Sequence, residues 1–439
     1  MTVTPPRHAG LESIPNLPLL PSFRVKSGMA VFLFLAVVSA QAATNFDYKG
    51  NIKYRSLLTS YPADSLFQDY IDDPAWDNNA NLRLNLSARK NAWALQADYE
   101  LVTIHGDSVS LAQQNPGLGF TPRLIPDDDH RLMDLTHIIS QDANSVTAHH
   151  LDRLHLDYST DQAFFRIGRQ AVSWGNGLIY NPMDFFNPFD PAAVDKEYKT
   201  GDDMLYAQYL FDSSNDLQAV WVGRRDDNGD VSSTVSSSAV KYHLFVEDYE
   251  FDLLVAEHFD SPTLGLGGVA NVGGSIWRSD IVLTDTDSDT YLSVLINFSY
   301  SWVALDKNVS AAVELYRNGF GIDDGDYSPS ALANNPQLVQ RLQRGELYTI
   351  GKHYLAATAT IELSPLWLFT PNIFANLDDH SLMLQLLSQH DLQQDLQLLI
   401  AANFPIGDEG SEFGGIDSGV PGRPLSIDAS VFMQLGWYF

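Results

Sequence analysis

The chain has 439 residues, a net charge of −29 and no cysteine, and 45% of its residues are hydrophobic. The absence of cysteine excludes disulfides, thiolate metal sites and a thiol nucleophile, and the acidic excess disfavours nucleic-acid binding. No run of 18 or more apolar residues occurs, so an inner-membrane transporter built from helices is not expected.

The first feature in chain order is an export signal. Residues 29–39 form an apolar run that is too short to cross a bilayer. Arg24 and Lys26 precede this run, and the sequence Ala-Gln-Ala follows it. A basic start, a short apolar core and an Ala-x-Ala end are typical of a secretory signal peptide. We therefore expect a signal peptide over 1–42, with an over-extended translation start as one option, and a folded unit over 43–439. The alternative for the apolar run is a buried helix.

Beyond residue 43, hydrophobic and polar residues alternate with a period of two, which indicates β-strands with one apolar face. Residues 80–104 show the pattern clearly, with a turn at Lys90-Asn91 that predicts a hairpin. A soluble sandwich would show the same period. Here, however, the polar positions carry many opposite charges, as expected of the lumen of a membrane barrel.

The alternation predicts eighteen strands, and bacterial single-chain barrels have an even number. The strands are expected near 45–57, 80–90, 92–104, 150–158, 162–170, 203–212, 215–225, 234–246, 249–259, 268–275, 276–286, 290–304, 308–319, 350–363, 366–377, 381–390, 394–406 and 426–439. The pair over 268–286 has the weakest pattern, so sixteen strands is the alternative. The Leu- and Gln-rich stretch 381–399 has poor helical spacing and is interpreted as two strands.

Short and long connections alternate along the predicted strands. The long ones are 58–79, 105–149, 171–202, 320–349 and 407–425. Short periplasmic turns and long external loops are the outer-membrane arrangement. We therefore predict an all-β fold, a transmembrane antiparallel barrel of about eighteen strands.

The last segment, 426–439, alternates and ends in Trp437-Tyr438-Phe439. In this it resembles outer-membrane barrel proteins generally. The resemblance implies that the barrel-assembly machinery recognises the terminal strand and that the chain resides in the outer membrane of a Gram-negative bacterium.

A second resemblance lies in the stretch that begins at Arg166. It reads Arg-Ile-Gly-Arg-Gln and is followed by Trp174-Gly175. This is similar to a strand-to-loop motif of porin-like families, the alginate-export and phosphate-selective types among them. The resemblance covers about a tenth of the chain. It implies a porin-type channel for passive diffusion of small polar or charged solutes, without indicating which solute.

The segment 171–202 combines Asn-Pro pairs with Phe185, Phe186 and Phe189. Proline stiffens such a segment and keeps it out of a strand, and the phenylalanines are too apolar for a free solvated loop. We predict that it folds into the lumen as a constriction. An external loop packed on its neighbours is the alternative.

The alternation and this loop together give a set of candidate pore-lining charges. The cationic candidates are Arg83, Arg89, Arg153, Arg166, Lys196 and Lys199, and the anionic ones are Asp98, Glu100, Asp157, Asp184 and Asp195. Charged rings or walls set ion selectivity in pores. The alternative is that these charges pair with one another and only fill the lumen. Cation or anion preference stays open.

No catalytic, cofactor or metal site is predicted. The acidic run 285–289 has calcium-loop spacing at its start but lacks the later glycine and glutamate, so an EF-hand is rejected. Besides the channel, two functions remain: a plugged barrel acting as receptor, adhesin or export-system partner, and an outer-membrane hydrolase. Expected partners are membrane lipid, lipopolysaccharide, the assembly machinery and small solutes, with a homo-oligomer among the options.

Overall fold

The computed structural model describes residues 45–114 and 125–439, so the predicted signal peptide lies outside the described residues. Within these ranges the chain is almost entirely β-structure. Its strands are β1 (Asn45–Ser60), β2 (Ala75–Lys90), β3 (Trp93–Gly106), β4 (Thr136–Asp142), β5 (Ser145–Ser159), β6 (Ala163–Gln170), β7 (Asp202–Leu210), β8 (Asp216–Val222), β9 (Ser237–Val246), β10 (Tyr249–His258), β11 (Ser261–Val272), β12 (Ser275–Asp285), β13 (Thr290–Ala304), β14 (Lys307–Arg317), β15 (His353–Ser364), β16 (Trp367–Asn376), β17 (Leu382–Gln393), β18 (Leu396–Ile406) and β19 (Ala429–Tyr438). Its helical segments are η1 (Leu66–Asp69), α2 (Asp107–Gln114), α3 (Pro329–Ala333) and α4 (Pro336–Arg344).

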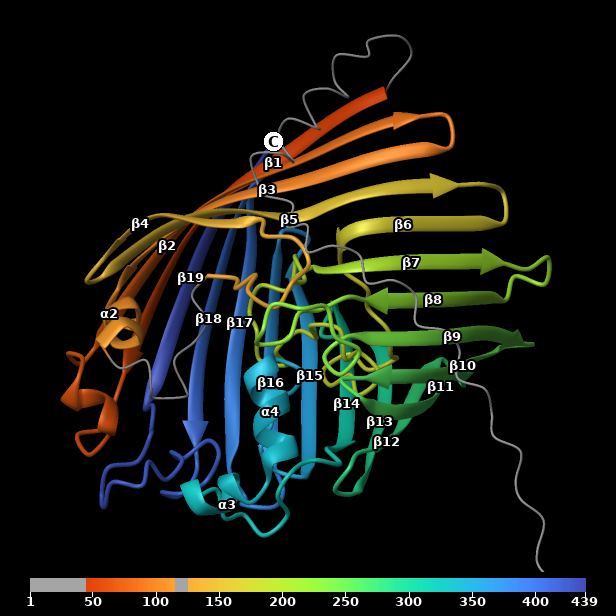
Figure 1. Cartoon of the computed structure of the whole chain (residues 1–439). Coiled ribbons are helices and arrows are strands. Elements are labelled where there is room, and N and C mark those ends of the chain that lie inside the picture. The colour runs from red at the N-terminus through yellow and green to blue at the C-terminus, as the bar shows by residue number, and fades with distance from the viewer. Residues whose placement is uncertain (1–44, 115–124) are drawn as a thin grey trace, which may run out of the picture.

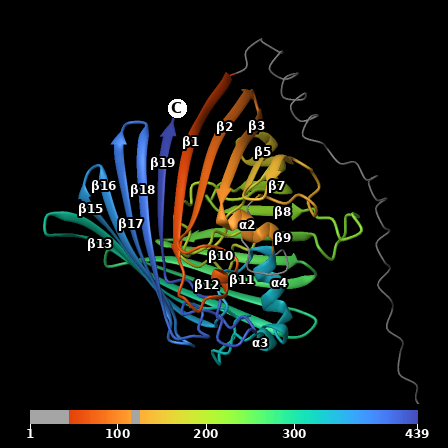
Figure 2. The same cartoon turned by 90° about the vertical axis from the view of Figure 1, so that its left-hand side faces the viewer.

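The strands form one closed antiparallel sheet (Figures 1 and 2), in which β1 pairs with β19. β4 is an addition to the barrel: it pairs with residues 145–150 of β5, whose other edge pairs with β3. The same edge of β5 pairs with β6 over residues 154–159. In the described chain eighteen strands therefore close the barrel, which confirms the predicted number. The sixteen-strand alternative is wrong, and β4 was not predicted.

The largest difference from the predicted strands is β11, which begins at Ser261 and not near residue 268. It follows β10 through a two-residue turn, Phe259-Asp260, in which both residues have a positive φ of 48° and 59°. The glycines at 265, 267 and 268 interrupt the apolar alternation of β11, because glycine has no side chain to mark a face.

The two ends of the barrel differ in their connections. The turns at 91–92, 247–248 and 305–306 lie at the same end as the start of β1 and the end of β19, which we call the short-turn end. The longer connections and the helices lie at the opposite, long-loop end (Figures 1 and 2). This is the predicted arrangement, although the turns after β10 and β12 at the long-loop end are short as well.

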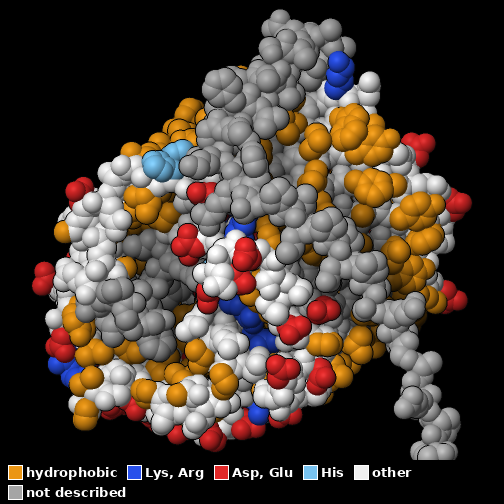
Figure 3. All heavy atoms as spheres, in the orientation of Figure 1, with side chains coloured by type: hydrophobic (Ala, Val, Ile, Leu, Met, Phe, Trp, Pro, Cys, Tyr) orange, Lys and Arg blue, Asp and Glu red, His pale blue; other side chains and the backbone are white. Residues whose placement is uncertain are grey.

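The two faces of the wall have opposite character. On β10, Leu253 and Val255 are 47% and 61% exposed on the outside, whereas Asp252 and His258 are buried on the inside. In Figure 3 hydrophobic side chains form a band over the strands at the right-hand edge, and charged side chains gather near the centre. No helix in the described ranges is both long and apolar enough to cross a membrane.

Candidate functional site

The connection between β6 and β7, residues 171–201, runs inside the barrel (Figure 1), and we call it the inner loop. The side chain of Asn176 donates to Asp280 on β12 with an N–O distance of 2.7 Å. The backbone N–H groups of residues 178–180 donate to the carboxylate of Glu314 on β14 at 2.5 to 3.2 Å. Both carboxylates are completely buried on the inner wall. Only a loop with an inward course can reach them.

The second half of the inner loop continues around the wall. Gln385 on β17 donates to the carbonyl oxygen of Ala192 at 2.8 Å. Lys53 on β1 then binds Asp195 at 2.7 Å and Glu197 at 2.5 Å. The wall contacts thus follow the order β12, β14, β17 and β1, so the loop lies along much of the inner circumference.

The local sequence permits this tight course. A Cβ atom on Gly177 would lie 1.8 Å from the carbonyl oxygen of Tyr180, so only glycine fits there. The Asn-Pro pairs at 181–182 and 187–188 keep the backbone out of helix and strand. The loop is therefore held by fixed backbone geometry as well as by its contacts with the wall.

A buried clasp ties three parts of the inner loop together. The Lys199 Nζ atom binds both carboxylate oxygens of Asp184 at 2.6 and 2.7 Å. It also donates to the Val172 carbonyl oxygen at 2.6 Å and to the Ser173 hydroxyl at 3.2 Å. Burial raises the pKa of Asp184 to about 6, although the Lys199 ammonium acts to lower it. Start, middle and end of the loop thus share one ammonium group.

The aromatic residues of the inner loop pack against the wall. Trp174, Met183 and Phe186 belong to a buried cluster with Val222 on β8 and Leu254 on β10. This packing explains why a loop within a polar lumen carries apolar side chains: each buried aromatic residue removes a large apolar surface from water.

One group of charges joins the loop to β1. Asp195 accepts from Lys53 and, at 2.8 Å, from Arg55. Burial favours the neutral acid, but these two cations outweigh it and hold the pKa of Asp195 at about 2. Arg55 is 26% exposed. It is therefore a cation that a solute in the lumen can meet.

A second group is centred on Arg83. Its guanidinium binds Glu100 at 2.6 Å and Asp152 at 2.9 Å, and it lies 3.9 Å from the centroid of the Tyr198 ring. Asp152 was not predicted. The pairing of β3 with β5 shifts there, so that Asp152 lies between the residues opposite Asp98 and Tyr99. A bulge of this kind changes the parity of the strand, so an alternation continued through residue 152 would give the wrong face.

Among the other predicted charges, Arg153 joins the Arg83 group through Asp152. Asp157 and Arg166 pair at 2.7 Å, and Arg89 is exposed at the end of β2. Lys196 is exposed and donates to a loop carbonyl. Arg153 binds Asp152 at 2.9 Å and also donates to the Lys199 carbonyl oxygen. The candidates therefore form several separate ion pairs, and they do not share a single ring.

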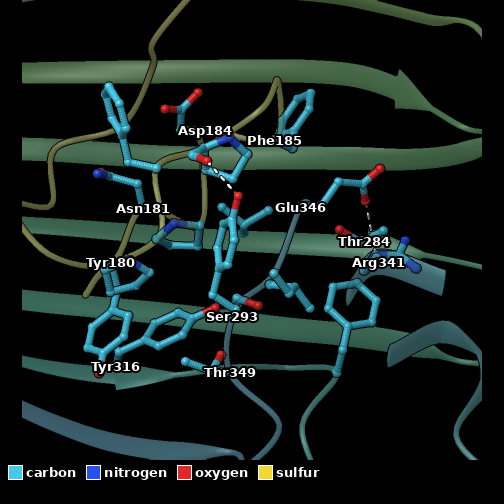
Figure 4. Close-up of a pocket in the computed structure, with 18 of the residues that line it drawn as sticks. Tyr180, Asn181, Asp184, Phe185, Thr284, Ser293, Tyr316, Arg341, Glu346 and Thr349 are labelled. Carbon is cyan, nitrogen blue, oxygen red and sulfur yellow. Dashed lines mark hydrogen bonds and ion pairs between the residues drawn. The ribbon is translucent and has the colours of Figure 1, made fainter. Parts of the chain in front are cut away.

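Cavities lie on both sides of the inner loop. The larger, about 250 Å³, lies between the end of the loop and the wall of β1, β2, β3 and β5. Its charged lining comprises Lys53, Arg55, Arg83, Glu100, Asp152 and Asp195. The smaller, about 80 Å³ (Figure 4), lies between the inner loop and residues 318–352, with Tyr180, Phe185, Tyr316, Thr284 and Ser293 in its lining.

Residues 318–352, which we call the second loop, also reach inward. Glu346 binds His258 on β10 at 3.1 Å, and Ser237 on β9 lies 2.8 Å from the other nitrogen of this histidine. Serine, histidine and carboxylate in a row resemble a hydrolase triad. Ser237, however, is only 2% exposed and accepts a further hydrogen bond from Arg224. We interpret the row as an anchor for the second loop.

Two further polar residues of the motif that starts at Arg166, namely Arg169 and Gln170, have a structural role. The Arg169 guanidinium binds Asp203 at 2.9 Å and Asp128 at 2.8 Å, and Gln170 donates to the Met204 carbonyl oxygen. Arg169 and Gln170 are each 1% exposed. They hold the junction at which the chain leaves the wall and enters the lumen.

A partly buried carboxyl anchors the long connection 407–428. Glu412 accepts from the Tyr354 hydroxyl at 2.6 Å, from Asn376 at 2.8 Å and from the backbone of Ile350 at 3.1 Å. Burial raises the pKa of Glu412 to about 7, although these three donors act to lower it.

This carboxyl predicts a pH-dependent stability. Because the folded pKa exceeds the ordinary value of 4.5, the folded barrel holds this proton more tightly, and the stabilisation is lost as pH rises through about 7. We expect lower stability at pH 8 than at pH 6, by about 1.4 kcal/mol in total, because the loss ends once the pH exceeds the folded pKa. Unfolding midpoints from gel-shift assays measure this. Glu412→Gln should flatten the slope, and exposed Glu409→Gln should keep it; equal slopes in all three proteins would contradict the assignment.

Several of these residues carry a sequence signal that was not used. Lys53 and Arg55 alternate with Ile52 and Tyr54 on β1, and Glu314 stands between Val313 and Leu315 on β14. A charged residue between outward apolar residues is expected to face the lumen. Applying the alternation to every strand would have found them.

No cluster of side chains that could hold a metal ion occurs in the described ranges.

No protein-family model matches the chain, and no curated protein does. Solved structures do match. Pseudomonas aeruginosa OccK5 (OpdH) has 12% identity and a TM-score of 0.52, and OccK8 (OprE) of the same organism has 8% and 0.52. A BenF-like porin from Pseudomonas fluorescens Pf-5 has 9% and 0.50. Each match covers 90% of this chain and 98% of the other. At these identities the likeness is one of fold.

Proposed function

We propose that the chain is a channel of the bacterial outer membrane through which small polar or charged solutes diffuse passively. The observation that carries this proposal is the closed barrel with an apolar outer face and an ionic interior. Such a wall satisfies its backbone groups internally and presents apolar side chains to lipid. The similar structure described as a porin has a similar fold. Residence in the outer membrane, export by the signal peptide and recognition of β19 by the assembly machinery belong to this proposal.

The inner loop is the proposed constriction. It occupies lumen space along the wall and brings Asp195 and Glu197 opposite β1. A solute that passes this level meets the cavity of about 250 Å³ between the loop and the wall. The porin-like motif at 166–175 supports a porin function generally. A link to the alginate-export or phosphate-selective types remains a prediction.

The charges at this level support a weak ion preference. Three cationic and three anionic side chains line the larger cavity within the described part of the chain, and all six are paired with one another. Fixed charges of opposite sign in equal number largely cancel at the distance of a passing ion. Arg55 is partly exposed, so its removal should shift the preference towards cations.

Current through single molecules tests the proposal. Refolded protein in a planar bilayer should give discrete ohmic steps, with a small reversal potential under a potassium chloride gradient. Arg55→Ala should move that potential towards cation selectivity, and Arg89→Ala, at the exposed end of β2, should move it less. A barrel that shifts on gels between boiled and unboiled samples but stays silent in the bilayer would refute the channel.

A plugged barrel that acts as a receptor is the second candidate. The observation in its favour is that two loops, 171–201 and 318–352, both reach into the lumen and meet through a hydrogen bond from the Tyr348 hydroxyl to the Pro188 carbonyl oxygen at 3.3 Å. A silent bilayer would favour this function. The hydrolase alternative has less support, because the hydroxyl of Ser237 is buried.

A further inference from the structure

The outer face of the barrel carries an apolar groove of about 620 Å³ across β3, β5, β6, β7 and β8. Its lining includes Trp93, Tyr158, Phe165, Ala207, Ala219 and Trp221. These strands lie side by side in the wall (Figure 1), and hydrophobic side chains cover the same edge of the molecule in Figure 3.

The groove exists because small and large residues are segregated on this face. Ala207 on β7 stands directly opposite Ala219 on β8, so two adjacent strands present only methyl groups. Phe165 borders this pair on β6, and Trp221 borders it further along β8. Large side chains beside a pair of alanines leave a hollow that no side chain of the wall fills.

The position of the groove indicates what fills it. Its lining residues continue the exposed apolar belt of the barrel. It begins at the short-turn end, where Trp93 opens β3 and its ring lies 4.7 Å from that of Tyr158. In an outer-membrane barrel the short turns are periplasmic, so the groove faces the inner leaflet.

A cation stands at the same rim. Lys90 is exposed and lies directly opposite Trp93 across the hairpin turn. The neighbouring turns along the groove carry the exposed acids Asp161 and Asp212. An anionic headgroup is therefore attracted to the side of Lys90 and repelled from the other two turns.

We propose that the groove is a binding site for a phospholipid of the inner leaflet, with one acyl chain over Ala207 and Ala219 and the phosphate at Lys90. This inference rests on the proposed membrane function. A flexible acyl chain fills a hollow of irregular depth, whereas a second copy of the chain would need a matching projection.

Native mass spectrometry with added phosphatidylglycerol tests the site. Wild-type barrels released from a mild detergent should retain one phospholipid more often than Ala207→Phe/Ala219→Phe barrels, several-fold. The control is Ala311→Phe/Ala359→Phe, a second pair of alanines opposite each other on β14 and β15. It should retain lipid as the wild type does, and Lys90→Ala should lose part of the retention.

The outcomes separate the inference from the proposed function. Equal retention in the groove-filled and control barrels, with normal channel current, would overturn the lipid site alone. Retention of lipopolysaccharide and no phospholipid would also overturn it. Disulfide-linked dimers of the Trp221→Cys variant in membranes would overturn it too, because they would place a second copy of the chain on this face. The chain has no other cysteine that could form such a link. A protein that does not enter bilayers would overturn the proposed function itself.

Discussion

Replacing Lys199 by methionine is expected to release the inner loop and to raise both the conductance and the current noise of the channel. The substitution removes the ammonium that Asp184, Val172 and Ser173 share. It leaves the Asp184 carboxylate buried without a counterion. Breaking a buried ion pair by removing one partner costs roughly 3 to 5 kcal/mol. The free-energy difference between the bound and the released inner loop then becomes much smaller. Single-channel recordings measure the conductance and the current noise that follow.

Two further variants separate the clasp from a mere change of charge. Lys196→Met removes the same charge from an exposed lysine three residues away, and it should leave the conductance nearly unchanged. Asp184→Leu/Lys199→Met replaces both buried partners by apolar groups, which is often neutral, and it should recover wild-type conductance. If Lys196→Met opened the channel as strongly as Lys199→Met, the clasp would not hold the loop.

Glu314→Ala is expected to detach the inner loop at its other anchor while the barrel still forms. The Glu314 carboxylate accepts the backbone N–H groups of residues 178–180. Without it these groups stay buried and unsatisfied, at about 1 to 3 kcal/mol each. We expect larger conductance steps, together with faster proteolysis of the inner loop in refolded protein.

The control for this anchor is Glu362→Ala on the neighbouring strand β15. Among the described residues Glu362 binds only the Asn308 side chain, in an exposed pair, so its loss should change neither conductance nor proteolysis. Unchanged cleavage of the loop in Glu314→Ala would show that the packed aromatic residues and the clasp hold the loop without this carboxylate.

Features of the fold that depend on residues close together in the sequence were predicted well, and the others were not. Alternation of apolar and polar residues repeats within a few residues, so it gave the number of barrel strands and located all of them except β11 closely. β11 was misplaced because Gly265, Gly267 and Gly268 carry no side chain to show a face. β4 was missed because its seven residues extend only the edge of β5 and have no alternation of their own.

The same distinction applies to the candidate site. From the sequence alone came the barrel, the inward-facing parity of Arg83 and Glu100, and the expectation of an apolar, stiff loop within the lumen. The partner of each charge came only from the tertiary structure. Lys53 and Asp195 lie 142 residues apart, and Asp152 reaches Arg83 through a shift in register. Parity is a property of one strand, whereas an ion pair depends on how distant strands and loops are brought together.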